Sequence, residues 1–567
     1  MTTPTTLRPP TWVLLVLSGA LLGLAYPPNP IGLFGSVGLV PLLLALERAD
    51  SWRKLLKWSY LSLLLFSALS SWWIGSWQAK ADPFLMISCV LLVIVHPLFF
   101  MVPLVAYRWV RERRGRFFAL AFLPFLWCGG EYLHALTDAS YPWLTLGNTQ
   151  TYNLYYIQFI EFTGVWGLSF LLLVQNAAFT AMIFSLGFES RHQTRMFRFG
   201  MTLIALTLVP PFLYGFYVLS RHADEPAEKS ITVTVVQPNV DPWDKWNQAD
   251  TTDHIALNYR LSAQSPAARS TQMFLWSENA IPYPVTQPGY EARREAMDAA
   301  VATLGRPVMS GFPDYVVYHA GDQPPVTSRP GVTVDPASGR LDTTFRWDYF
   351  NSVGLWAPGK GLTGAYHKMQ LVPFGERIPF ADDVPFLTGL LSWDVGISSW
   401  AKGRTIQTFD VPIGDTITKS ASVICFESIY PNIVRQFIDS GANFMTIITN
   451  DGWYLGTPGP LQHNRIAIMR AIETRRSIAR AANTGISSFI TPYGSIFNET
   501  EEGVTTTTTG AIALRDDITL YVRWGDWWPI LCLIASGLML VYAGAARTRA
   551  SRPAEVAPTD VDTAAIR

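Results

Sequence analysis

The stretch VICFESIY, residues 423–430, is a short apolar run that ends at Cys425 and continues to an acidic residue, Glu427. Together with the two residues before it, this run predicts a strand over 421–428 that is buried on both faces. Similar runs predict strands at 231–240, 273–282, 351–358, 443–451 and 485–494. The Thr-rich stretch 504–510 predicts a strand near the domain edge, and helical periodicity covers 290–305 and 463–483. This alternation predicts an α/β domain with helices outside a sheet.

Cys425 stands apart from the other three cysteines, Cys89, Cys128 and Cys532, which all lie in long apolar runs. It therefore has no partner within its own domain. Free cysteine is among the most buried residue types, and an unpaired cysteine in an extracytoplasmic domain is also a candidate reactive thiol. Both interpretations are open on this residue alone.

The composition points to a membrane protein without a nucleic-acid partner. Formal net charge is +0, charged residues make up 15% of the chain against about 25% in soluble proteins, and there are 21 tryptophans. A transmembrane helix needs roughly 20 mostly apolar residues. Eight runs qualify, of which the second is short: 11–27, 33–47, 58–77, 84–107, 117–136, 162–187, 199–220 and 527–546.

The positions of Lys and Arg predict the orientation of these spans, because cytoplasmic loops are enriched in both. The loops after spans two, four, six and eight are basic, whereas residues 136–160 contain no Lys or Arg. Both termini are therefore expected in the cytoplasm. The expected domains are seven helices in 1–220, an extracytoplasmic domain in 221–526, the eighth helix in 527–547 and a disordered cytoplasmic tail in 548–567.

Polar residues stand out at three expected strand ends of the α/β domain, where ligands commonly bind. Glu278 follows MFLW, Lys368 and Glu376 lie in YHKMQLVPFGERIPF, and Cys425 ends its own run. Each alone fits a solvated loop charge. Together they form a complete acyl-transfer site, in which a carboxylate accepts the thiol proton and an ammonium stabilises the oxyanion. The chain contains no glycine-loop or zinc-type motif, so no metal, nucleotide or other cofactor is expected.

These stretches resemble the nitrilase or carbon–nitrogen hydrolase superfamily, whose site is a Glu–Lys–Cys triad. Within it, the whole chain to about residue 547 is similar to the apolipoprotein N-acyltransferase family. The matching stretches are GLAYPP (23–28), YPWLTLGN (141–148), VVQPNVDPWDKW (235–246), WSENAIPYP (276–284), HKMQLVPFGERIP (367–379), CFESIYP (425–431), TNDGWY (449–454) and HNRIAIMRAIETRRSIARAANTGIS (463–487).

The resemblance implies an αββα-sandwich domain on eight spans in the bacterial inner membrane, with the catalytic domain in the periplasm. It implies transfer of an acyl chain from a phospholipid, commonly phosphatidylethanolamine, through a cysteine thioester to the amine of diacylglyceryl-cysteine apolipoproteins. A monomer is expected.

Site roles follow from the same resemblance. Glu278 is expected to act as general base, Lys368 as oxyanion stabiliser and Cys425 as nucleophile. Supporting positions are Trp246, Glu376, Phe426 and Glu427. Phe426 stands where the family's better-known form has Tyr, so a hydroxyl is not required there.

The position of the segment 385–400 and the function of the protein each allow an alternative. The apolar, Trp-containing segment 385–400 is either a lid that dips into the membrane surface or a loop packed under the domain core. Trp143, in the outward loop 141–148, is expected at the membrane interface beside the same entrance.

The rival functions are a membrane-tethered nitrilase-type amidase, which would not need seven helices before its domain, and a transporter or sensor with an inactive domain, which would not need the triad.

Overall fold

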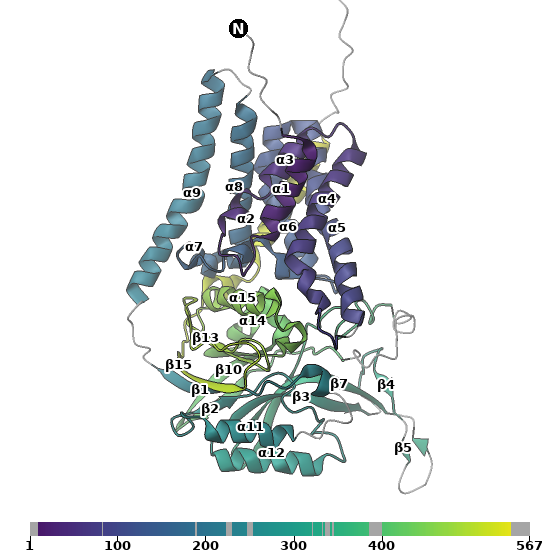
Figure 1. Ribbon diagram of the computed structural model, residues 1–567, viewed down its shortest axis with the longest axis vertical. Helices are drawn as coiled ribbons and strands as arrows, with labels where there is room; N and C mark the ends of the chain where they lie inside the picture. The colour runs from purple at the N-terminus through teal and green to yellow at the C-terminus, as the bar shows by residue number, and fades with distance from the viewer. Residues whose placement is uncertain are drawn as a thin grey trace, which may run out of the picture.

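The structure is a computed structural model that describes residues 9–81, 83–186, 190–222, 229–245, 253–319, 321–331, 333–334, 341–342, 345–384 and 400–545. A bundle of long helices stands on one side of a layered α/β domain (Figure 1). Trp246, residues 385–399 of the apolar segment and the tail 548–567 lie outside the described residues.

The helical part follows the predicted apolar runs. Its helices are α1 (Thr11–Gly23), α2 (Leu33–Val37), α3 (Val40–Glu47), α4 (Trp52–Ser71), α5 (Pro83–Arg114), α6 (Arg116–Ala135), α7 (Leu154–Ile157), α8 (Ile160–Ser185), α9 (Ser190–His222) and α17 (Trp527–Gly544). By length and composition, four helices of the described chain could cross a membrane: Leu85–Arg114, Ile160–Ser185, Ser190–His222 and Trp527–Gly544.

The predicted span over 33–47 is a short apolar helix, Leu33–Glu47, and is not one of the four long ones. It is divided into α2 and α3 at Gly38 and Leu39, which keep right-handed helical backbone angles. Pro41 lies in the first turn of α3, where it has no N–H to donate to a carbonyl of the preceding turn. Helices overlap the other seven predicted runs.

The α/β domain contains two sheets. The larger has the order β15-β1-β2-β3-β7-β4, with β8 beside β7, and the smaller has the order β14-β13-β12-β11-β10-β9. The strands of the larger sheet are β1 (Ser230–Gln237), β2 (Met273–Leu275), β3 (Val308–Tyr318), β4 (Arg329–Pro330), β7 (Arg346–Ala357), β8 (Gly361–His367) and β15 (Thr506–Ala513). Those of the smaller sheet are β9 (Phe409–Ile413), β10 (Thr416–Ile424), β11 (Phe444–Thr449), β12 (Ile478–Ala482), β13 (Ser488–Ile490) and β14 (Ile496–Phe497). A separate pair is formed by β5 (Thr333–Val334) and β6 (Leu341–Asp342).

The layers are helix, sheet, sheet and helix. Inner-face residues of both sheets, among them Val235, Met309, Val423 and Ile447, belong to one buried cluster. Helices α11 (His254–Gln264) and α12 (Glu291–Leu304) cover the outer face of the larger sheet through a second cluster. Helices α14 (Pro431–Asp439) and α15 (Pro458–Thr474) lie between the smaller sheet and the helical bundle (Figure 1). The αββα order expected from the resemblance is therefore present.

The predicted helix over 463–483 was partly wrong. Helix α15 ends at Thr474, and residues Ile478–Ala482 form the buried strand β12. Arg475 adopts a left-handed conformation with φ 49°, which ends the helix. The expected Thr-rich strand is present as β15, at the end of the larger sheet.

Buried ionic contacts join the α/β domain to the bundle at α8. The Arg475 guanidinium donates to both carboxylate oxygens of Glu161 at 2.9 and 2.8 Å and to Gln158 at 2.6 Å. Helix α8 is broken at Gly164, where φ is 66° and ψ is −178°. This break frees the Val165 N–H to donate to Glu473 of α15 at 2.7 Å. The end of α15 is thus held by charged hydrogen bonds from the start of α8.

We expect Glu161→Gln to lower the free energy of unfolding by roughly 3 kcal/mol, because it leaves Arg475 buried beside a neutral partner. Thermal unfolding of the detergent-purified protein would show this as a lower Tm. The matched control is Glu112→Gln, whose carboxylate pairs with Arg108 but is 36% exposed, and which should change stability by less than about 1 kcal/mol. Equal losses in the two variants would contradict a special role for the α8 contact.

Candidate active site

The three expected catalytic residues each follow a strand. Cys425 comes directly after β10, Lys368 directly after β8, and Glu278 three residues after β2. Strands β2 and β8 belong to the larger sheet and β10 to the smaller one, so the site lies where the two sheets end together. This placement is the reason that residues about 150 positions apart in the chain share one site.

Lys368 is the centre of the charged part of the site. Its ammonium lies 3.3 Å from Glu278 Oε1 and 2.9 Å from Glu376 Oε1, and its side chain is 1% exposed. Burial alone would lower the pKa of Lys368. The two carboxylates outweigh burial and raise this pKa above its ordinary value. Lys368 therefore stays positively charged at any pH at which the protein works.

Asn351 is a site residue that the sequence analysis missed. Its side-chain amide donates to Glu278 Oε1 at 2.7 Å and to Glu376 Oε1 at 2.8 Å. It lies inside strand β7, which was predicted as a strand without regard to this polar side chain. The other oxygens are also held, since Asn450 N–H donates to Glu278 Oε2 at 3.0 Å and Val372 N–H to Glu376 Oε2 at 2.8 Å. Both carboxylates are thus fixed in orientation.

Cys425 occupies a tight turn after its strand. Its φ is 49°, a left-handed conformation that is uncommon for a residue with a side chain. Its thiol is partly exposed and accepts a hydrogen bond from Thr449 Oγ1 at 3.2 Å. Desolvation, and after it the charge of Glu278, raises the pKa of Cys425 well above its ordinary value, while Lys368 opposes this shift. The resting thiol is therefore protonated and needs a base.

Glu427 is placed to hold the turn rather than to react. It is completely buried, and its Oε1 accepts from Tyr366 OH at 2.8 Å, Met369 N–H at 2.6 Å and Gln370 N–H at 3.1 Å. Its Oε2 accepts from Ile424 N–H at 3.1 Å. Desolvation raises the pKa of Glu427 to about 7, and Lys368 opposes this shift. One carboxylate thus ties the strand before Cys425 to the segment after Lys368.

A second polar network lies behind the nucleophile. His463 Nε2 is 3.1 Å from the Cys425 carbonyl oxygen and 2.8 Å from Ser428 Oγ, and its Nδ1 is 2.8 Å from Asp451. Arg480 donates to Asp451 at 2.7 Å. Burial opposes the charge of Asp451, but Arg480 and His463 hold the pKa of Asp451 below its ordinary value.

Cys425, Asp451 and His463 offer ligand atoms within 4.8 Å of one another, the geometry of a possible metal site. The Asp451 carboxylate and both His463 ring nitrogens already have hydrogen-bond partners in this network. A metal ion would have to displace these partners. The arrangement fits a support for the turn at Cys425 better than it fits a metal site.

A mostly apolar cavity of about 260 Å³ extends from Cys425 toward α5. Phe426, Tyr141, Trp143 and Trp73 line it near the nucleophile. Trp143 was expected at the membrane interface, but it is 4% exposed and donates from Nε1 to Gln462 at 2.8 Å. The ring of Phe426 stacks on Tyr141 at 6.4 Å. Trp143 and Phe426 are therefore wall residues of the cavity.

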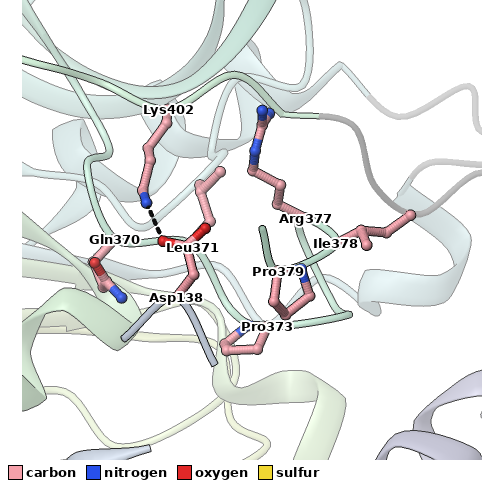
Figure 2. A pocket seen from close by; sticks show the side chains of 8 residues that line it. All are labelled: Asp138, Gln370, Leu371, Pro373, Arg377, Ile378, Pro379 and Lys402. Atoms are coloured by element: carbon pink, nitrogen blue, oxygen red, sulfur yellow. Dashed lines mark hydrogen bonds and ion pairs between the residues drawn. The ribbon is translucent and has the colours of Figure 1, made fainter. Parts of the chain in front are cut away.

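The segment after Lys368 contacts the loop after α6 beside this cavity. Lys402 Nζ lies 2.6 Å from Asp138 Oδ1, and the Phe380 N–H donates to Asp138 Oδ2 at 3.1 Å. Figure 2 shows Lys402 directed at Asp138, with Pro373 and Arg377 around the same small hollow. Burial opposes ionisation of Asp138, but Lys402 holds its pKa below the ordinary value. Asp138 thus connects two stretches of the catalytic domain to the membrane part.

Comparison with known proteins identifies the family. The model of the apolipoprotein N-acyltransferase N-terminal domain matches residues 18–178, and that of carbon–nitrogen hydrolases matches residues 232–518.

Three proteins named apolipoprotein N-acyltransferase are similar over nearly the whole chain. The protein of Chlorobaculum tepidum is 34% identical (93% of this chain, 95% of that one), that of Geobacter metallireducens 30% (94% and 95%), and that of Pseudomonas syringae pv. tomato 26% (95% and 99%). Among solved structures, Saccharomyces cerevisiae Nit3 aligns with 53% of this chain and 96% of its own, at 14% identity and a TM-score of 0.34. The chain belongs to the apolipoprotein N-acyltransferase family.

Asn351→Ala should slow acyl transfer by about 10- to 100-fold, since it removes two hydrogen bonds to charged groups that orient Glu278 and Glu376. Single-turnover acylation, followed by mass spectrometry, would measure the rate. Asn432→Ala is the matched control, because the described hydrogen bond of this amide goes to Arg435 on α14 and not to a triad residue. Wild-type rates in Asn351→Ala would show that the amide does not position the carboxylates.

Charge at the site should control the alkylation of Cys425 by iodoacetamide. A negative charge disfavours the thiolate, so Glu278→Gln should lower the thiol pKa and move alkylation to lower pH. Lys368→Met removes a positive charge and should move alkylation to higher pH. Peptide mapping separates Cys425 from Cys89, Cys128 and Cys532, which are buried. Profiles that do not move, or move in the opposite direction, would refute this electrostatic assignment.

Proposed function

We propose that Cys425, Glu278 and Lys368 carry out the acyl transfer of this apolipoprotein N-acyltransferase. The protein moves an acyl chain from a phospholipid, through a thioester on Cys425, to the N-terminal amine of diacylglyceryl-cysteine apolipoproteins. The observation that carries this proposal is the cavity, because it joins the nucleophile to the side of a membrane helix. A phospholipid chain can enter such a space without leaving an apolar environment.

The first half-reaction forms the thioester. Glu278 takes the proton from Cys425 Sγ, and the thiolate attacks the sn-1 ester carbonyl carbon of the phospholipid. The tetrahedral oxyanion is stabilised by the Lys368 ammonium and by the backbone N–H of Phe426. The carbon–oxygen bond then breaks, and protonated Glu278 returns the proton to the leaving glycerol oxygen. The products are the acyl-enzyme and a lysophospholipid.

The second half-reaction forms the amide. The neutral α-amine of the diacylglyceryl-cysteine attacks the thioester carbonyl, and Glu278 takes a proton from the attacking nitrogen. The same donors hold the oxyanion. The carbon–sulfur bond breaks, the thiol of Cys425 recovers a proton from Glu278, and the triacylated lipoprotein leaves. Glu376, Asn351 and Glu427 contact the reacting groups or their neighbours and act as positioning residues.

The proposal also includes eight spans in the inner membrane. Both termini are in the cytoplasm, and the catalytic domain is in the periplasm. The basic loops after spans two, four, six and eight support this orientation. The domains are then seven helices in 1–220, the catalytic domain in 221–526, the eighth helix in 527–547 and the tail 548–567. Helices α1, α4 and α6, with the α2–α3 pair, would supply the spans beyond the four long apolar helices.

The finer substrate choices are also proposals. Phosphatidylethanolamine is taken as the donor. A monomer is taken as the working form, since the described triad, its positioning residues and the cavity wall all come from one chain. Trp246 is retained as a supporting residue from the resemblance alone. The mostly apolar lining of the cavity favours lipid over the small amides of the rival amidase function.

Incubation with phosphatidylethanolamine should add one acyl mass to the wild-type protein and none to Cys425→Ala, as measured by intact-mass spectrometry. A diacylglyceryl-cysteine peptide should then remove the adduct and gain the same mass. Far-UV circular dichroism and Tm would show that both proteins are folded. A folded wild-type protein that gains no acyl mass but hydrolyses small amides would establish the amidase instead.

A further inference from the structure

The wall of the cavity that begins at Cys425 has one unusual residue. Its lining is apolar along most of α5, but it also contains His96. His96 is 3% exposed and lies beside His134, 6% exposed, with ring centres 5.0 Å apart. Within the described residues, neither ring nitrogen of His96, nor His134 Nε2, nor the Tyr141 hydroxyl has a partner at good hydrogen-bond distance and angle. Ser71 is a polar neighbour of the Tyr141 hydroxyl, and the Tyr141 backbone is a polar neighbour of His96. We call His96, His134 and Tyr141 the polar floor.

A row of rings connects the nucleophile to the polar floor. Phe426 is next to Cys425, and its ring centroid lies 6.4 Å from that of Tyr141. The ring centroids of Tyr141 and His96 are 5.7 Å apart. His96 is 13 residues beyond the first residue of α5, Pro83, or about 20 Å along the helix axis. Within the described lining, only Phe99 on α5 lies farther along this helix. Within the polar floor, His96 therefore lies farther from Cys425 than Tyr141 does, toward the Phe99 end of the α5 lining.

Buried polar atoms without partners are costly, so native structures almost always satisfy them with protein, water or ligand. A methylene group cannot do so. Water can, provided that the space is large enough and several polar atoms face it. The nitrogens of His96 and the hydroxyl of Tyr141 are polar atoms that such a water could bind in the cavity. An acyl chain packed against His96 would instead cover the imidazole with methylene groups and leave its nitrogens unsatisfied.

We propose that the polar floor limits the length of the acyl chain that Cys425 accepts, with His96 as the specificity-determining residue. The inference rests on the proposed function, since it assumes an acyl chain in this cavity. A chain whose terminal methyl stops short of His96 is accommodated in apolar surroundings. A longer chain meets hydrated polar groups and gains no further burial.

The test compares acyl donors with each other within each variant. Phosphatidylethanolamines whose sn-1 chains form a graded length series are mixed in detergent, and the acyl masses on Cys425 are read by intact-mass spectrometry. His96→Leu removes the polarity with little change in volume. His96→Gln keeps a polar group, and Tyr141→Phe removes one hydroxyl only. Leu98→Ala is the control, because Leu98 is 50% exposed on α5 and is not part of the cavity lining.

The wild type should show a steep loss of labelling beyond one chain length. In His96→Leu, chains one or two carbons longer should gain about fourfold for each methylene that becomes buried. Tyr141→Phe should shift in the same direction by less, whereas His96→Gln and Leu98→Ala should keep the wild-type profile. Because each profile is a ratio within one protein, a general loss of activity does not change it.

An unchanged profile in both His96→Leu and Tyr141→Phe would overturn the inference while leaving the thioester chemistry intact, and would mean that the histidines only pack. A shift in Leu98→Ala equal to that in His96→Leu would overturn it as well, by assigning the effect to α5 as a whole. Absence of any acyl mass on the wild type would instead refute the proposed function, and the inference with it.

Discussion

The active site depends on one buried positive charge, the ammonium of Lys368. A charge with 1% exposure is stable only beside opposite charges and hydrogen-bond acceptors. Glu278 and Glu376 supply both, and Asn351 holds the two carboxylates in place. Burial raises the pKa of the Cys425 thiol, and the negative charge of Glu278 raises it further. The carboxylate that stabilises Lys368 therefore adds to the need for a base, and Glu278 is also the group that can act as one.

The fold provides this cluster by ending strands of two sheets at one place. Glu278 and Lys368 follow strands of the larger sheet, while Cys425 follows a strand of the smaller one. Packing two sheets face to face fixes their strand ends relative to each other, since interiors are close-packed and resist sliding. Glu427 adds a direct connection, because its carboxylate accepts N–H groups from both sides of the site. The turn at Cys425 can hold its left-handed conformation because this network surrounds it.

Sequence reasoning named the triad, with Glu376 and Glu427 among its supporting positions, but it missed Asn351. Glu278, Lys368 and Cys425 stand out because they are polar or reactive groups next to apolar runs. Asn351 does not stand out, since one amide within a strand is common and only the neighbouring strands reveal its partners. The end of α15 was missed for a related reason, since Ile478–Ala482 is equally apolar as a helix or as a buried strand. The apolar pattern of the sequence shows that these residues are buried. It does not show that the helix ends at the left-handed turn of Arg475 and that a strand follows.

The cavity explains why the two parts of the molecule must remain docked. Its wall combines α5 and the loop after α6 with residues of the catalytic domain, including Phe426 and Tyr454. Neither part encloses the space alone, so the position of the catalytic domain on the bundle determines the shape of the cavity. Polar contacts hold that position, among them Arg475 with Glu161, Glu473 with Val165, and Lys402 with Asp138. These contacts are directional, and they add to the packing of one buried apolar cluster that includes residues of both the bundle and the catalytic domain. The packing of the two sheets thus fixes the catalytic residues relative to one another. The contacts at the junction fix them relative to the helical bundle.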